Sequence, residues 1–330
     1  MDRALERKLD VLRADHLEVT GVAFSHFYCP ILFRDEPGDL CVAHIVNQSF
    51  RGSGKEWTVQ RKDVDNFYGG VFEGDFVDLQ HSGKHSPDAV IADQALSRKL
   101  RPRVELGGAV VQHFPAKGRV PKHFAEVVVS GPKGDVRLGL KIHPNDAMAT
   151  KGQGWQIVIE KDIRLAALVS ILKAAHLTMF EMLGYRYALS AGGCFLGKTV
   201  LGDFFLRCGN LSKAEALPAA MTHFRQFSNM MRPVESVGEE ARGTISDGLV
   251  FVCRCSDETP WAFLVFIRTG ELLHAALVPV LETEIAAERF ATFLRGDGGT
   301  IRGNRCRFVE NKWFGSSKSE TLTWPTGNFV

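Results

Sequence analysis

The sequence predicts an α+β protein whose two halves differ in character. Residues 19–60 and 124–162 carry short apolar runs typical of strands, separated by Gly, Pro and Ser. Residues 163–183 instead repeat apolar side chains at helical spacing, and residues 248–281 hold three successive apolar runs with turns between them. We therefore expect a β-rich N-terminal half, then a helical pair that leads into a small antiparallel sheet with a helix.

Composition is that of an ordinary globular protein. The 330 residues are enough for two domains or one large one, with 45% hydrophobic and 24% charged residues. Charged residues interrupt every apolar run before it reaches the length of a membrane span, and the charged N-terminus is unlike a secretory signal. Seven scattered cysteines favour a reducing compartment over a disulfide framework. We expect a cytoplasmic protein that does not bind a membrane.

The N-terminal half begins with a helical pattern over residues 2–15. Strands are expected at 19–33 and 39–50, joined by a turn at Pro37-Gly38. After a loop rich in Gly and Ser comes a short strand over 57–60. The acids that follow it are typical of the first turn of a helix, which the glycines at 69, 70 and 74 make short or broken.

The C-terminal half begins after the softest boundary, at residues 148–154, so the expected domains span 1–150 and 151–330. The helix over 163–183 is apolar nearly all round, which predicts burial, and Gly184 is its natural end. Further helices are expected at 198–207 and 213–221, followed by three strands and a helix ended by Gly296.

One histidine stands inside an apolar run, LCVAHIVNQSF, as residue 44. The next expected helix starts with Asp63, Asp65 and Asn66. An imidazole near neutral pH can activate water, and carboxylate and amide oxygens can hold a hard cation that neutralises charge on a phosphodiester. His44 is therefore a candidate base, with a hydrogen-bonded structural histidine as the alternative.

The stretches CVAHIVNQSF and VQRKDVDNFYGGVFEGDF resemble the HNH (ββα-metal) endonuclease superfamily. They are similar to the family's histidine-bearing strand and to its following helix, although the family's cysteine is missing from that helix. The resemblance implies an N-terminal ββα core in which His44 is the general base and Asn66 matches the family's asparagine. Ala43 stands where many members carry an acidic metal ligand.

The resemblance implies a metal-dependent endonuclease that hydrolyses DNA, a type often used in restriction or phage defence. The implied cofactor is Mg²⁺ or Mn²⁺, with candidate ligands His44, Asp63, Asp65, Asn66, His81 and His85. The alternative is an inactive HNH-derived scaffold, without the acid at position 43, that binds nucleic acid or a partner protein. A homo-oligomer is compatible with both.

Zinc is a separate candidate cofactor. Cys29, Cys41, His81 and His85 together supply four ligands of the types that zinc takes in tetrahedral sites. The alternative is that the two histidines belong to a polar loop.

Nucleic-acid contacts would have to be local, because a net charge of +2 gives the whole chain little attraction to DNA. Residues 98–122 hold seven bases and one acid, Glu105, and such an excess can line a phosphate track. The candidate contacts are Arg61, Lys62, Arg98, Lys99, Arg101, Arg103, Lys117, Arg119 and Lys122. A solvated face is the alternative.

The run GGCFLGKT, residues 192–199, satisfies the phosphate-binding-loop pattern and makes Lys198 and Thr199 candidate nucleotide contacts. A functional loop needs a buried strand directly before it and a helix that begins at the lysine. Here a long helix is expected before it, so a glycine turn between two packed helices is the alternative.

Overall fold

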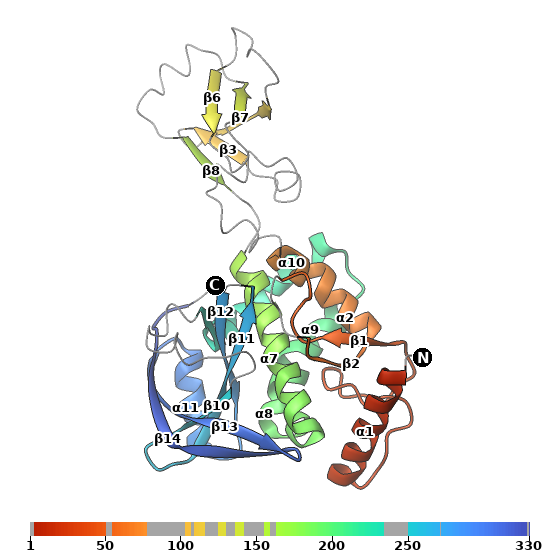
Figure 1. Cartoon of the computed structure of the whole chain (residues 1–330). Helices are drawn as coiled ribbons and strands as arrows, with labels where there is room; N and C mark the ends of the chain where they lie inside the picture. The colour runs from red at the N-terminus through yellow and green to blue at the C-terminus, as the bar shows by residue number, and fades with distance from the viewer. Residues whose placement is uncertain are drawn as a thin grey trace. The chain divides into compact units, whose positions relative to one another are not determined.

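The computed structural model describes two compact units, and the chain is α+β with several antiparallel sheets (Figure 1). Unit 1 comprises residues 1–74 and 164–330, and unit 2 comprises residues 75–163. The expected boundary at residue 150 therefore differs from the observed division, because unit 1 is assembled from both ends of the sequence. The described residues are 3–50, 55–77, 103–106, 109–115, 125–129, 136–141, 155–158, 163–233, 250–270, 272–328 and 330.

Unit 1 begins with α1 (Arg3–Thr20), which is longer than the helix predicted over 2–15. The strand predicted over 19–33 is wrong, since this segment forms no strand beyond one isolated bridge, Tyr28 to Asp35. Its apolar side chains instead fill the core from a loop. Phe24 and Tyr28 pack against the buried ring of His16, with ring centroids 5.5 and 4.9 Å away.

The hairpin of β1 (Leu40–His44) and β2 (Trp57–Arg61) is antiparallel, and α2 (Lys62–Tyr68) follows it directly. The acids of the first helical turn lie where the backbone dipole favours negative charge. The helix continues as the π-helical turn η1 (Gly69–Glu73). Helical structure then continues through residue 77, so the glycines make the helix irregular, as predicted, but they do not make it short.

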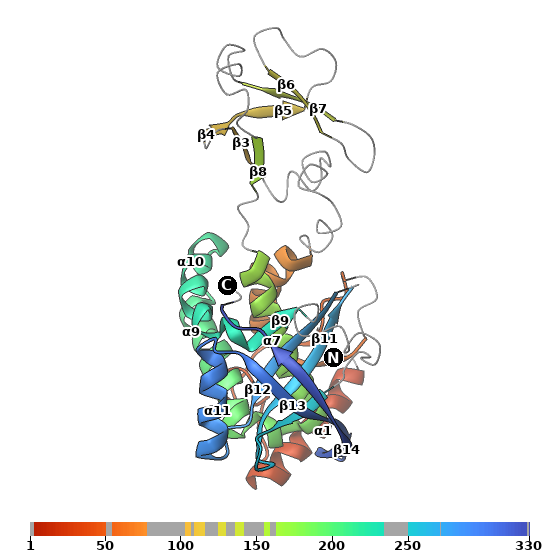
Figure 2. The same cartoon turned by 90° about the vertical axis from the view of Figure 1, so that its left-hand side faces the viewer.

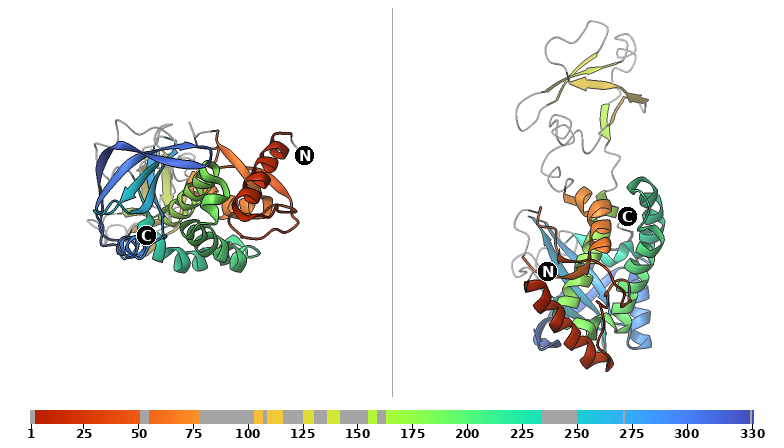
Figure 3. Two further views of the ribbon diagram at one scale, coloured as in Figure 1. Left: turned by 90° about the horizontal axis from the view of Figure 1, so that it is seen from below. Right: turned by 90° about the vertical axis from the view of Figure 1, so that its right-hand side faces the viewer.

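The central element of unit 1 is α7 (Ile163–Ala188). It lies between the six-stranded sheet and the N-terminal elements, as Figure 1 and the view from below in Figure 3 both show. Gly184 interrupts it with φ 58° and ψ −143°, which confirms the predicted end of the regular helix. Residues 164–188 have the length and hydropathy of a membrane span, but 89% of an 18-residue apolar stretch within them is buried, as in the core helix of a globular protein.

Four helical segments follow α7, namely α8 (Ala191–Cys194), η2 (Phe195–Gly202), α9 (Asp203–Cys208) and α10 (Lys213–Phe224), before the 3-10 turn η3 (Arg225–Met230). Glycine is required here by close packing. A Cβ on Gly192 would lie 1.8 Å from the carbonyl oxygen of Pro279, and one on Gly197 would lie 2.5 Å from that of Pro30. Both predicted helices are confirmed, and the first extends N-terminally through the glycine run.

The six-stranded sheet has the order β14-β13-β10-β11-β12-β9 and is antiparallel throughout (Figure 2). The three predicted C-terminal strands are confirmed as β10 (Val250–Arg254), β11 (Pro260–Thr269) and β12 (Leu272–Pro279), with α11 (Glu284–Leu294) after them. Phe293 of α11 stacks on Trp261 of β11 with ring centroids 4.7 Å apart. The sequence did not predict the remaining strands, β9 (Met231–Pro233), β13 (Gly299–Val309) and β14 (Lys312–Trp324).

Unit 2 holds two three-stranded antiparallel sheets in its described residues. One has the order β4-β3-β8, from β3 (Arg103–Leu106), β4 (Ala109–Val111) and β8 (Trp155–Val158). The other has the order β5-β7-β6, from β5 (His113–Pro115), β6 (Ala125–Val129) and β7 (Val136–Leu140). The pairing of Val129 with Val136 confirms the hairpin predicted in this region.

Candidate functional site

A buried lysine lies at the polar centre of unit 1. The side chain of Lys173, on α7, is 1% exposed, and its Nζ donates to Oδ1 of Asp65 (2.8 Å) and Oε1 of Glu73 (2.7 Å). Burial by itself lowers the pKa of this amine, but the carboxylates of Glu73 and Asp65 outweigh burial and raise it above its ordinary value. Lys173 is therefore a cation enclosed by protein.

Two further side chains complete this group, which we call the Lys173 cluster (Lys173, Asp65, Glu73, Asn47 and Cys41). The Asn47 amide donates to Oε2 of Glu73 (3.3 Å), and the Cys41 thiol lies 3.9 Å from Oδ2 of Asp65. Burial, together with the charge of Asp65, raises the pKa of the Cys41 thiol to about 11. Cys41 is thus a protonated thiol at neutral pH, and not an activated nucleophile.

His44 ends β1 and lies on the other face of the hairpin. Cross-strand pairs in the regular β1–β2 register put His44 with Trp57 and Cys41 with Gln60, so the alternation of side chains sends His44 and Cys41 to opposite faces. The Cys41 thiol contacts Asp65 of α2, whereas His44 is half-buried and its Nε2 lies 2.5 Å from the Gln48 amide nitrogen.

The other predicted ligands have separate surroundings. Asp63 receives two hydrogen bonds from Arg61 (3.1 and 2.7 Å), and these outweigh partial burial and lower the pKa of its carboxyl group. Asn66 is exposed on α2. His81 and His85 lie outside the described residues.

The structure thus does not bring the described candidate metal ligands together. Among the residues it describes, no group of three His, Cys, Asp or Glu side chains could hold a metal ion. Asp65 and Asp63 already have cations as partners, Lys173 and Arg61. For the candidate zinc site, the thiol of Cys29 donates to the Gln60 side chain (3.1 Å) and Cys41 belongs to the Lys173 cluster. The described residues therefore do not fit Mg²⁺, Mn²⁺ or Zn²⁺ in this arrangement.

The predicted nucleic-acid contacts are only partly described. Arg61 is 14% exposed and is paired with Asp63 and Glu36, so its charge is used within the protein. Lys62 is exposed at the start of α2, and Arg103 lies in β3 of unit 2. The rest of the predicted basic track lies outside the described residues, namely Arg98, Lys99, Arg101, Lys117, Arg119 and Lys122.

The glycine-rich pattern adopts helical structure. Lys198 and Thr199 are exposed on η2, and the segment follows α7, not a strand. The backbone amide of Gly193 donates to the Ser190 hydroxyl (3.1 Å), and that of Cys194 donates to the Ser190 carbonyl (2.8 Å). These amides are therefore already used to begin α8, and the strand–loop–helix context of a phosphate-binding loop is missing here.

The sequence did not point to Lys173 or Glu73, although a signal existed. Lys173 is a charged residue in the middle of a mostly apolar helix, and lysine is almost never fully buried unless it is paired. Such a lysine predicts buried acids elsewhere, but the sequence does not say which.

No protein-family model, curated protein or solved structure matches the chain. The resemblance to the HNH superfamily thus rests on the residues quoted above.

Proposed function

We propose that this chain is a nucleic-acid-binding protein on an HNH-derived scaffold, in which the acids of the strand–strand–helix unit do not serve a metal ion. The observation that carries the proposal is the position of Lys173. Its ammonium group lies between Asp65 and Glu73 and supplies the positive charge that a nuclease of this type would take from a divalent cation.

Energetics support this assignment of the acids. Breaking a buried ion pair costs about 3–5 kcal/mol, because it leaves an uncompensated charge in a poorly solvated place. A metal ion that recruited Asp65 would first have to displace a lysine that is fully enclosed and donates to both carboxylates. Asp63 would likewise have to leave the two-point contact with Arg61.

Nucleic acid is the proposed partner for two reasons. The element order of hairpin then helix, with a histidine at the end of the first strand, is the one that the resemblance implies. The predicted basic track over residues 98–122 adds a local positive charge to a chain whose net charge is only +2.

The test combines binding with cleavage. Wild type and His44→Ala are incubated with supercoiled plasmid in Mg²⁺, Mn²⁺, Zn²⁺ or EDTA, and both nicking and the gel shift of the DNA are scored. We expect a shift without nicking in every condition, unchanged by His44→Ala. His26→Ala is the matched control, because His26 is an exposed histidine outside the hairpin. Metal-dependent nicking that is lost in His44→Ala alone would contradict the proposal.

A DNA endonuclease, such as those used in restriction or phage defence, is the second candidate function. The observation that favours it is the half-buried ring of His44 at the end of β1, since an imidazole in reach of solvent can act as a general base. In that case His44 would take a proton from the attacking water after the Gln48 amide moves away from Nε2. The plasmid assay separates the two functions.

A further inference from the structure

The β13–β14 hairpin carries basic side chains without acidic partners. Arg305 and Arg307 on β13 and Lys312 on β14 are all exposed, and within the described chain none of the three forms an ion pair. Arg302, by contrast, pairs with Glu258 at 3.2 Å. Residues 302–318 contain five bases and one acid, Glu310, although the whole chain has a net charge of only +2.

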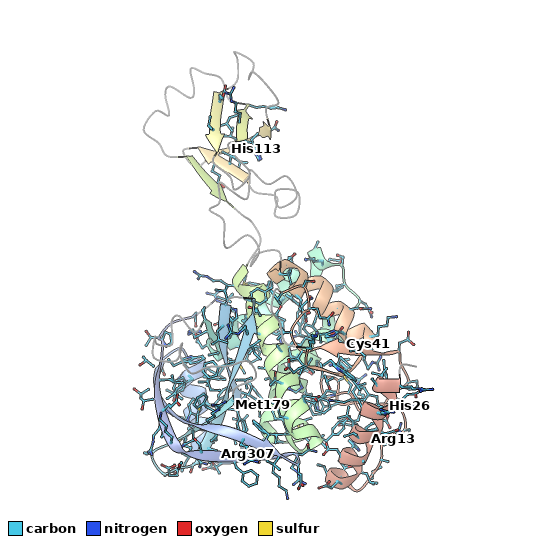
Figure 4. All side chains as sticks on the ribbon, in the orientation of Figure 1. Arg13, His26, Cys41, His113, Met179 and Arg307 are labelled. Atoms are coloured by element: carbon cyan, nitrogen blue, oxygen red, sulfur yellow. The ribbon has the colours of Figure 1, made fainter. Side chains whose placement is uncertain are left out.

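The register places two of these cations on one face. Arg307 pairs across the hairpin with Phe314, and Val309 pairs with Lys312, so each pair shares a face. Arg305 lies two residues before Arg307 on β13, at the register shift between Asn304 and Cys306. We call these exposed residues the cationic strip (Arg305, Arg307, Val309, Lys312 and Phe314). Figure 4 labels Arg307 on this ribbon at the lower edge of unit 1.

Apolar side chains on the strip are exposed as well. Phe314 is 56% exposed and Val309 is 39% exposed, which is costly for side chains that water does not solvate well. The neighbouring Trp313 points the other way, with its ring 5.5 Å from that of Phe263 on the sheet. The hairpin therefore has a packed inner face and a free outer face that alternates cations with apolar groups.

A cavity of about 560 Å³ opens beside the tip of the hairpin. Its walls include Tyr187, Phe263, Pro279 and Trp313, and it shares Lys312 and Phe314 with the strip. This volume lies within the range of ligand pockets. The apolar, aromatic walls of this cavity suit a planar ring. The cations beside it suit an anionic group on the same molecule.

We propose that the cationic strip binds single-stranded nucleic acid, with phosphates on Arg305, Arg307 and Lys312 and unstacked bases on Phe314 and in the cavity. Three cations on one hairpin without acidic partners repel one another, and a phosphate backbone relieves that repulsion while it releases counterions. Exposed aromatic rings stack bases only where the base faces are free, as they are in a single strand. This inference rests on the proposed function and names a surface and substrate class for it.

The test is fluorescence anisotropy of labelled single-stranded DNA and RNA oligonucleotides, and of a DNA duplex, over a range of salt concentrations. The variant Arg305→Ala/Arg307→Ala/Lys312→Ala should bind single strands at least tenfold more weakly. Its plot of log K against log salt should also be shallower by about 2, because each phosphate contact to a single strand contributes about 0.7. Phe314→Ala should weaken single-strand binding by about tenfold and leave that slope unchanged.

The control variant is Arg3→Ala/Arg7→Ala/Arg225→Ala, which removes the same charge from exposed positions elsewhere in unit 1. All changed side chains are exposed, and circular dichroism verifies that each variant is folded. We expect the control to bind like wild type.

The outcomes distinguish the two proposals. Wild type that binds nucleic acid and a strip variant that binds equally well would overturn the strip and leave the proposed function in place. Wild type that binds no nucleic acid would overturn both proposals. This holds even if the strip is then found to bind another anionic partner, such as a lipid vesicle or an acidic protein. Tighter binding of duplex than of single strands would overturn the assignment of single-stranded substrate.

Discussion

The ammonium group of Lys173 donates to Glu73 at 2.7 Å across a separation of 100 residues in the sequence. Glu73 is the last residue but one before unit 2 begins, and Lys173 follows soon after unit 2 ends. The contact therefore joins the two stretches of chain that flank the inserted unit. Among the described residues, Lys173 is the only buried lysine, with a side chain that is 1% exposed.

Replacing Lys173 with Met should strongly destabilise unit 1. The apolar side chain fills much of the same space, but it leaves the carboxylates of Asp65 and Glu73 without their cation. We expect a loss of about 3–5 kcal/mol in the free energy of unfolding, measured by urea denaturation. The matched control is Lys198→Met on the exposed face of η2, where the change should stay within about 0.5 kcal/mol. Equal effects of the two variants would show that the buried pair contributes nothing specific.

The reactivity of Cys41 reports on the same cluster. Burial and the charge of Asp65 raise the pKa of this thiol to about 11, compared with about 8.5 for a free cysteine. At pH 8.5 the thiolate fraction, and with it the rate of alkylation by iodoacetamide, should be about a hundredfold lower than for a free thiol. Peptide mass spectrometry measures the rate at this site. Asp65→Asn should accelerate it, and an unchanged rate would contradict the contact.

Acid should destabilise the protein through His176. This ring is buried, with Nε2 3.0 Å from the carbonyl oxygen of Pro30 and Nδ1 2.9 Å from the hydroxyl of Tyr187. Burial lowers its pKa to about 4. Because the unfolded chain binds the proton with a pKa of about 6.5, stability is full above that pH and falls as the pH drops towards 4, by roughly 3 kcal/mol.

Urea denaturation at a series of pH values measures this effect, with His176→Gln as the test variant. The variant should be less stable at neutral pH but should depend less on pH between 6.5 and 4. A pH dependence identical to that of wild type would mean that other groups are responsible.

Gly184 should not tolerate a side chain. Its φ of 58° is unfavourable for other residues, and an added Cβ would lie 2.0 Å from Oδ2 of Asp15, which accepts the backbone N–H of Tyr185 at 2.6 Å. Gly184→Ala should cost on the order of 3 kcal/mol. Gly70→Ala is the control, since Gly70 is helical with open space around its Cα and should gain up to about 1 kcal/mol. Thermal denaturation that ranks the variants the other way would contradict this geometry.

Local patterns predicted much of unit 1. The strands at 250–254, 260–269 and 272–279 are apolar on both faces, and Gly184 ends the regular part of α7 as a helix-ending glycine should. Such patterns do not predict contacts between residues that are distant in the sequence. Phe24 and Tyr28 look like strand residues but pack from a loop onto His16, because burial does not require a strand.

The candidate site shows the same limit. Asp65 was singled out as an oxygen ligand near the start of a helix, but its actual partner, Lys173, is 108 residues away. Neither periodicity nor spacing identifies such a partner. The β13–β14 hairpin was not predicted either, because its exposed cations and glycines weaken the strand pattern, and those same cations form the strip.

The most direct measurement of the central claim is one gel-shift reaction with end-labelled single-stranded DNA in Mg²⁺ and Mn²⁺, with half of each sample run on a denaturing gel. A nucleic-acid-binding protein whose acids are held by Lys173 and Arg61 should shift the DNA and leave it uncut. Metal-dependent shortening of the DNA by wild type but not by His44→Ala would contradict the account and establish the endonuclease instead. An oligonucleotide that is neither shifted nor cut would contradict nucleic-acid binding itself.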